Sequence, residues 1–233
     1  MKDTILRVKD DTPQEYDKYF NIARDLSPVR AIYRVKKGIE LIGKKRGKVL
    51  SIGVGNLGEA IELKKAGFDV NICDISPSAI QYAQKNGFRA FQCDISKSPP
   101  EGKYDFIFCC AVLEHIVNPL AGIENLKQSL NQFGRLVISL PNEFNFFSRA
   151  QILFGHPPFG GHDWHHLRFF NTRFGEKLFQ KANLQIISKN YCPRIPLWNQ
   201  VSIFIGELLQ TLMPNLFSFS TVWLLEPRKD LNE

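Results

Sequence analysis

The chain has 233 residues, of which 44% are hydrophobic and 23% are charged, so it can form a globular α/β domain and is neither disordered nor fibrous. No stretch reaches the roughly 18 consecutive apolar residues that a membrane-spanning helix needs. The cysteines are odd in number and mostly lie inside apolar runs, and the charged N-terminal stretch lacks the apolar core of a secretory signal. We therefore expect reduced thiols and a cytoplasmic location.

The net charge of +7 is unevenly spread. Residues 30–48 are rich in Lys and Arg, and apolar residues recur there at helical spacing, which predicts an amphipathic helix with a basic outer face. Such a face is either simply solvated or attracts an acidic partner such as nucleic acid. We treat residues 1–45 as an N-terminal helical extension and residues 46–233 as the main domain.

From residue 48 onward, short apolar runs alternate with helical patterns. The predicted strands are 48–54, 69–75, 89–95, 104–110 and 134–141, and the predicted helices are 58–66, 77–86 and 119–131. Apolar strands separated by helices are typical of a parallel sheet with helices on both faces. Ligands bind such sheets beyond the carboxyl ends of the strands, so the functional residues are expected there.

The pattern changes after Asn142. Residues 143–171 are rich in Phe, His, Pro and Gly and have no clear period. Beyond them we predict a helix at 172–182, a strand at 184–190, a helix at 197–213 and a last strand at 216–227, which completes a mostly parallel seven-stranded sheet in a single α/β domain. The stretch 195–225 is strongly apolar, so it either completes the core and pocket or lies against a membrane surface or a partner.

A glycine loop, "GVGNLG" at residues 53–58, joins the first predicted strand to the first helix of the sheet. Gly53 and Gly55 allow a ligand to approach the backbone closely, and the helix behind them exposes unpaired N–H groups. Asp74 ends the second strand, where a carboxylate either accepts hydrogen bonds from the ribose hydroxyls of an adenosine or caps the next helix. Both S-adenosylmethionine (AdoMet) and a nicotinamide dinucleotide fit these features.

Asp94 ends the third strand and favours AdoMet, because its carboxylate can accept the adenine amino group while Ile95 packs on the ring. The segment "YDFIFCCAVLEHIVNP" at 104–119, together with 49–76, 93–95, 134–142 and 165–186, resembles the class I AdoMet-dependent methyltransferases, particularly small-molecule enzymes of ubiquinone biosynthesis. The resemblance implies a Rossmann-like methyltransferase domain. It also implies AdoMet as cofactor, with contacts from Gly53, Val54, Gly55, Asp74, Ile75, Asp94, Ile95 and Cys110.

The chain departs from the family pattern in its glycine loop. Ser51 stands where the family usually has an acid, and Gly58 comes one place later than the usual third glycine, where this chain has Leu57. The missing acid leaves open which group holds the methionine ammonium of AdoMet. The altered loop also keeps open a non-catalytic protein with this fold.

By the same resemblance, residues 143–171 form a substrate cap over the cofactor. The candidate acceptor contacts are Trp164, His166 and Arg168, and the candidates for a general base are His115, His162 and His165, with His166 in the same segment. Histidines three apart can share a metal ion, but no distant ligand completes such a site in the sequence, so we predict no metal.

The acceptor is expected to be a small molecule whose methylated atom (O, N or C) stays open. At residues 109–112 the sequence reads "CCAV" in place of the motif of enzymes that methylate exocyclic amines of nucleic acid bases, which argues against nucleic acid. The remaining enzyme alternative is an NAD(P)-dependent oxidoreductase. Its Tyr-x-x-x-Lys pair has one match, Tyr33 and Lys37, which precedes the glycine loop, and no length remains for a substrate domain.

Overall fold

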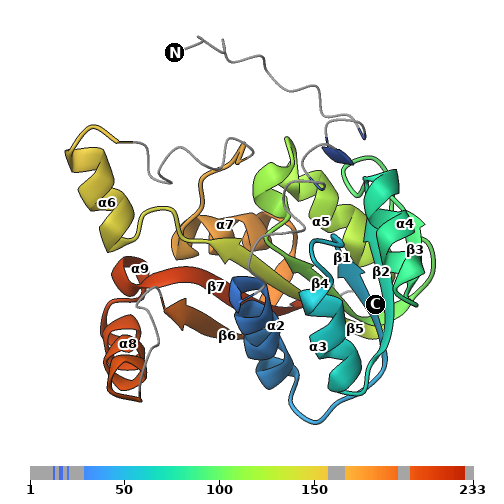
Figure 1. Ribbon diagram of the computed structural model, residues 1–233, viewed down its shortest axis with the longest axis horizontal. Helices are drawn as coiled ribbons and strands as arrows, with labels where there is room; N and C mark the ends of the chain where they lie inside the picture. The colour runs from blue at the N-terminus through green and yellow to red at the C-terminus, as the bar shows by residue number, and fades with distance from the viewer. Residues whose placement is uncertain are drawn as a thin grey trace.

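The computed structural model of the chain describes residues 13, 16, 17, 20, 29–156, 166–193 and 200–228. Its centre is a seven-stranded sheet with the order β3-β2-β1-β4-β5-β7-β6 (Figure 1). The strands are β1 (Lys48–Ile52), β2 (Asp69–Asp74), β3 (Arg89–Gln92), β4 (Tyr104–Cys110), β5 (Leu130–Pro141), β6 (Leu184–Pro193) and β7 (Ser218–Pro227). The helices include α2 (Val29–Ile42), α3 (Gly58–Lys65), α4 (Pro77–Lys85), η1 (Leu113–His115), α5 (Pro119–Gln128), α6 (Phe146–Leu153), α7 (Thr172–Lys181), α8 (Gln200–Leu212) and α9 (Pro214–Phe217).

The sheet is parallel from β3 to β5 and antiparallel at the other end. In the parallel part, Ser51 of β1 lies opposite Ile72 of β2 and Phe108 of β4, whereas β7 runs antiparallel to both β5 and β6. The predicted mostly parallel seven-stranded sheet is confirmed. Since the strand order reverses between β1 and β4, the carboxyl ends of these strands form the edge at which such sheets bind ligands.

Alternation along the strands builds a core on each face of the sheet. Val49 and Phe108 belong to the layer that also contains side chains of α2, α3 and α4. Their neighbours Leu50 and Cys109 belong to the opposite layer, which contains side chains of α5 and α7. Because both faces are buried, the strands are apolar at successive positions, and this property made them recognisable in the sequence.

The basic helix α2 packs on the sheet. Val35 is fully buried, and Gly38 lies so close to β4 and β5 that an added Cβ would be 2.8 Å from both Phe108 and Val137. Lys36 is on the outer side of the helix, where it pairs with Glu62 of α3. The helical part of the predicted extension thus contributes to the core, while the boundary at residue 45 stays a prediction.

Several elements differ from the sequence prediction: η1 was not predicted, and α9 includes residues 216 and 217, which were predicted to begin the last strand. Leu130 does not extend α5: the helix ends at Gln128, the Ser129 hydroxyl donates to the Pro100 carbonyl, and Leu130 begins β5 opposite Tyr104. Residues 143–171 contain the helix α6, which the sequence did not indicate. Its apolar residues are not confined to one buried face, since Leu153 is 81% exposed, so the helical period is lost.

The described residues of the apolar stretch 195–225 differ in their burial. β7 is central to the core, with Trp223 fully buried, whereas α8 exposes Phe204 and Leu212. In the part of the chain that the structure covers, no helix is both long enough and apolar enough to cross a membrane.

Candidate functional site

The glycine loop turns sharply after β1. Gly53 and Gly55 have φ angles of 90° and 48°, and the Gly53 N–H donates to the Cys73 carbonyl at the end of β2 over 2.7 Å. Leu57 also has a positive φ, 64°, a conformation that costs a non-glycine residue roughly 1–2 kcal/mol. Its side chain is 2% exposed, so burial offsets this cost. Leu57 therefore adopts a left-handed backbone at the position where the family usually has glycine.

Asp74 ties the end of β2 to the glycine loop. Its carboxylate accepts hydrogen bonds from the Val54 N–H at 2.7 Å and from the Ser76 N–H at 2.9 Å. Burial raises the pKa of Asp74, and these hydrogen bonds act in the opposite direction. The cap of α4 is Ser76, whose hydroxyl oxygen accepts from the Ala79 N–H. Asp74 thus lies at the loop, and its carboxylate can accept a further hydrogen bond from a ligand.

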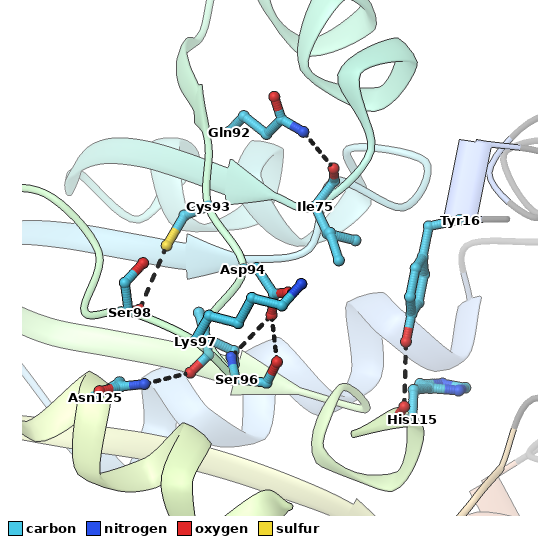
Figure 2. Close-up of polar contacts among 11 residues, drawn as sticks. Tyr16, Ile75, Gln92, Cys93, Asp94, Ser96, Lys97, Ser98, His115 and Asn125 are labelled. Carbon is cyan, nitrogen blue, oxygen red and sulfur yellow. Dashed lines mark hydrogen bonds and ion pairs between the residues drawn. The ribbon is translucent and has the colours of Figure 1, made fainter. Parts of the chain in front are cut away.

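Asp94 (Figure 2) and Ile95 follow β3. Asp94 accepts hydrogen bonds from the backbone and hydroxyl of Ser96 and forms an ion pair with Lys97 at 2.8 Å. Partial burial works to raise its pKa, but Lys97 and Ser96 outweigh it and lower the pKa. Ile95 is 5% exposed, and its carbonyl accepts from the Asn125 side chain of α5. The adenine contacts expected of these residues stay a prediction.

Another carboxylate, that of Glu59, follows the glycine loop in the first turn of α3. The hydroxyl of Ser51, which is fully buried in β1, donates to Oε1 of Glu59 in the first turn of α3 over 3.0 Å. Burial raises the pKa of Glu59 to about 7, and hydrogen bonds from Ser51 and Cys110 and the charge of Arg34 moderate this effect. The sequence analysis missed Glu59. The available signal was an acid in the first helical turn after a loop whose own acid is missing.

Cys110, at the end of β4, is close to this carboxylate. It is buried, and desolvation together with the Glu59 charge raises its thiol pKa well above the ordinary value. The thiol is therefore neutral near pH 7. Its predicted contact with the cofactor stays a prediction.

The loop after β4 is held from two sides. The Leu167 and Arg168 N–H groups donate to the Glu114 carbonyl at 2.8 and 3.1 Å. The Tyr16 hydroxyl donates to the His115 carbonyl at 3.1 Å, as Figure 2 shows. The short helix η1 thereby brings together an N-terminal residue and a segment after β5. These contacts connect parts of the chain that are far apart in the sequence.

Glu143, just after β5, anchors the same segment after β5, residues 166–170, which we call the late segment. One oxygen of its fully buried carboxylate accepts from the Phe170 N–H at 2.8 Å, and the other contacts Nδ1 of His166. The His166 ring meets the His115 ring edge to face, with 4.9 Å between the centroids. Two of the predicted histidines are thus neighbours, and Glu143, which sequence reasoning missed, holds one of them. An acid directly after a strand end was the available signal.

Glu114, His115 and His166 also form a possible metal-binding group. Each offers one ligand atom, and these atoms lie within 4.8 Å of one another. Glu114 is 1% exposed; burial raises its pKa, and the neighbouring histidines act to lower it. The sequence analysis found no distant ligand to accompany the late histidines, whereas the fold brings Glu114 and His115 beside His166. The prediction of no metal stays untested.

The remaining predicted residues are less closely connected. Arg168 is exposed, and its guanidinium donates to the Val117 carbonyl of the loop after β4. Trp164, His162 and His165 lie outside the described residues. The predicted substrate contacts and the identity of a general base therefore stay predictions.

The chain is similar to a known family and to known proteins. A family model described as a methyltransferase domain matches residues 29–189. The ubiquinone biosynthesis O-methyltransferase of Rickettsia prowazekii is 30% identical over 145 residues, which cover 58% of this chain and 55% of that protein. The chain thus spans about half the length of the curated relatives that it matches.

Solved structures share the fold. A Thermotoga maritima AdoMet-dependent methyltransferase, described as a possible histamine N-methyltransferase, is 16% identical with a TM-score of 0.62, covering 92% of this chain and 95% of its own. The 1,6-didemethyltoxoflavin-N1-methyltransferase of Burkholderia thailandensis, with bound S-adenosylhomocysteine, has the same identity and TM-score, covering 96% of this chain and 94% of its own. At this identity the likeness is one of fold.

Proposed function

The chain belongs to the methyltransferase domain family, and from that premise we propose that it transfers a methyl group from AdoMet to a small-molecule acceptor. The observation that carries this proposal is the glycine loop braced by Asp74 at the switch point of the sheet. An oxidoreductase is not favoured, because the family match and the solved relatives named above are methyltransferases.

The residues at the strand ends fit AdoMet. A Cβ at Gly55 would meet nothing within 4 Å, so glycine is favoured here by the positive φ angle and not by a lack of space. The loop is therefore open to a ligand at this point. In our proposal Asp74 binds the ribose and Asp94 the adenine, since carboxylates accept the hydrogen bonds that hydroxyl and amino groups donate. When bound, AdoMet supplies a methyl carbon that its sulfonium already activates for attack.

The main contribution of the chain is to orient the acceptor and to exclude water, which is worth roughly 7–11 kcal/mol in favourable cases. The second contribution of the chain is to accept a proton from the acceptor. An ionised Glu143 accepts the Nδ1–H of His166, so Nε2 is the unprotonated ring nitrogen and carries the lone pair of the proposed base. In this assignment His166 is the general base, and Glu143 positions it.

We further infer that the acceptor carries a hydroxyl group on an apolar molecule. Leu167 and Phe169 are 45% and 50% exposed. They follow His166 closely in the chain and offer apolar surface beside this proposed base. A hydroxyl needs the base because its proton leaves during transfer. The relative from Rickettsia prowazekii is named as an O-methyltransferase, which agrees with an oxygen acceptor.

The test combines binding with transfer. Calorimetry should detect AdoMet and S-adenosylhomocysteine but not NAD(P), and AdoMet with a labelled methyl group should label phenols or catechols that carry an apolar chain in preference to amines. His166→Gln should lower the rate of transfer at unchanged S-adenosylhomocysteine affinity, with Glu176→Gln, which breaks a surface ion pair with Lys189 outside residues 143–171, as control. The methyltransferase proposal fails if the chain binds none of the AdoMet-related ligands. If His166→Gln transfers at the rate of the control, the assignment of the base is wrong.

A further inference from the structure

Glu59 is a carboxylate that the assignments above leave without a role. It lies in the first turn of α3, directly behind the glycine loop, and it is partly buried. Its hydrogen-bond partners are the Ser51 hydroxyl and the Cys110 thiol, which come from the ends of neighbouring strands β1 and β4. A carboxylate is thus held between two strand ends at the edge that binds ligands.

The surroundings of Glu59 favour a cation. Hydroxyl and thiol groups donate hydrogen bonds but do not neutralise a negative charge, and Arg34 acts on the carboxylate through its charge without an ion pair among the described residues. Burial therefore destabilises the charged form, and its pKa rises to about 7. A positively charged ligand group beside this carboxylate would reverse that effect.

The strand order indicates which group this is. If adenine lies at β3 and ribose at β2, as proposed, the rest of the cofactor continues toward β1 and β4, because these strands follow in the order β3-β2-β1-β4. Glu59 lies at the ends of these two strands, through Ser51 and Cys110. The part of AdoMet beyond the ribose is a methionine, which carries an ammonium group.

We propose that Glu59 binds the ammonium group of the methionine part of AdoMet, and that Ser51 positions its carboxylate for this contact. The inference rests on the proposed function. It also accounts for Ser51: the carboxylate that β1 does not supply comes from α3, and the serine hydroxyl holds it in the place of a strand acid.

The test separates the amino-acid part of the ligand from the adenosine part. S-adenosylhomocysteine carries the ammonium, and methylthioadenosine lacks the whole amino-acid end, so the ratio of their dissociation constants reports the contribution of that end. Glu59→Gln keeps an oxygen for Ser51 but loses the charge. It should weaken S-adenosylhomocysteine roughly tenfold to a hundredfold, the value of a hydrogen bond to a charged group, and leave methylthioadenosine unchanged.

A matched control is available on the same helix. Glu62→Gln removes an equal charge one turn further along α3, where Glu62 pairs with Lys65 and Lys36, and it should leave the ratio unchanged. If Glu59→Gln leaves the ratio as in the wild type while both ligands bind, the role of Glu59 is refuted and the proposed function stands. If neither ligand binds the wild-type protein, both proposals fail.

A second measurement needs no variant. The groups around Glu59 are Ser51, the neutral Cys110 thiol and Arg34, and Asp74 is common to both ligands, so the ratio isolates the titration of Glu59. Below pH 7 protonation of Glu59 should weaken S-adenosylhomocysteine relative to methylthioadenosine, by up to about tenfold per pH unit. A ratio that stays constant from pH 8 to pH 5 would overturn the inference.

Discussion

Replacing Glu143 tests whether one buried carboxylate holds the late segment on the ligand-binding edge. Glu143→Ala removes both the acceptor for the Phe170 N–H and the partner of His166. We expect residues 166–170 to lose the side-chain part of their attachment to the end of β5. The bond from the Glu143 N–H to the Phe170 carbonyl and the contacts of Leu167 and Arg168 with the Glu114 carbonyl remain as backbone anchors of this segment.

The magnitude follows from the burial of these groups. The Glu143 side chain is fully buried and Phe170 is 6% exposed, so water cannot replace the lost acceptor without opening the structure. An unsatisfied buried N–H costs about 1–3 kcal/mol, and the lost charge-assisted contact contributes about 1.5–3 kcal/mol. We therefore expect Glu143→Ala to lower the free energy of unfolding by about 3–5 kcal/mol. Glu143→Gln keeps one acceptor and should cost about half as much.

Urea unfolding measures the change in stability, and limited proteolysis measures whether the late segment opens. Glu176→Gln is the control: it breaks an ion pair with Lys189 at the surface, which is worth about 0–1 kcal/mol. Proteolysis should cut Glu143→Ala after Leu167 or Arg168 faster than it cuts the control. A Glu143→Ala protein as stable as the control would refute the reasoning.

The remaining predictions concern the core and the cofactor loop. Without ligand, Glu59→Gln should be more stable than the wild type at pH 8, by up to about 3 kcal/mol. Since a raised folded-state pKa means that the folded protein binds the proton more tightly, this advantage should vanish as the pH falls through the window from 7 to 4.5; a pH-independent difference in urea unfolding would contradict it. Gly38→Ala should cost about 1–3 kcal/mol, because the added methyl group meets Phe108 at 2.8 Å; a neutral effect in thermal unfolding would mean that α2 does not pack this closely. Asp74→Asn turns one acceptor into a donor that faces the N–H of either Val54 or Ser76, and it should weaken S-adenosylhomocysteine by about tenfold or more in calorimetry; unchanged affinity would remove Asp74 from the cofactor site.

The sheet and the strand ends could be predicted because their signals are local. Buried parallel strands are apolar at successive positions, and both Asp74 and Asp94 follow such runs directly. The same local reasoning failed for Leu130, whose spacing suited the helix. Its place in β5 depends on pairing with Tyr104 and on the bond between Ser129 and Pro100, and neither contact is visible in the sequence.

The missing acid of the glycine loop shows that reasoning from local sequence is limited at the candidate site too. The sequence marks Ser51 as a departure but cannot show what compensates for it. Glu59 reaches Ser51 because the chain reverses between β1 and α3, a turn made possible by the positive φ angles of Gly55 and Leu57. His166 was likewise an isolated candidate in the sequence, and Glu143 was missed, because the fold alone brings these two side chains together.

The two proposed halves of the site depend on different parts of the chain. The proposed cofactor half is formed by β1, α3 and β2, where Asp74 holds Val54 through a hydrogen bond across 20 residues of sequence. The proposed acceptor half depends on the loop after β4 and on the segment after β5, through the contacts of Tyr16 with His115 and of Glu143 with His166. Substitutions in the late segment can reshape the acceptor half without disturbing the glycine loop. Differences in acceptor between proteins of this fold should consequently arise in the late segment, while the contacts around Asp74 stay the same.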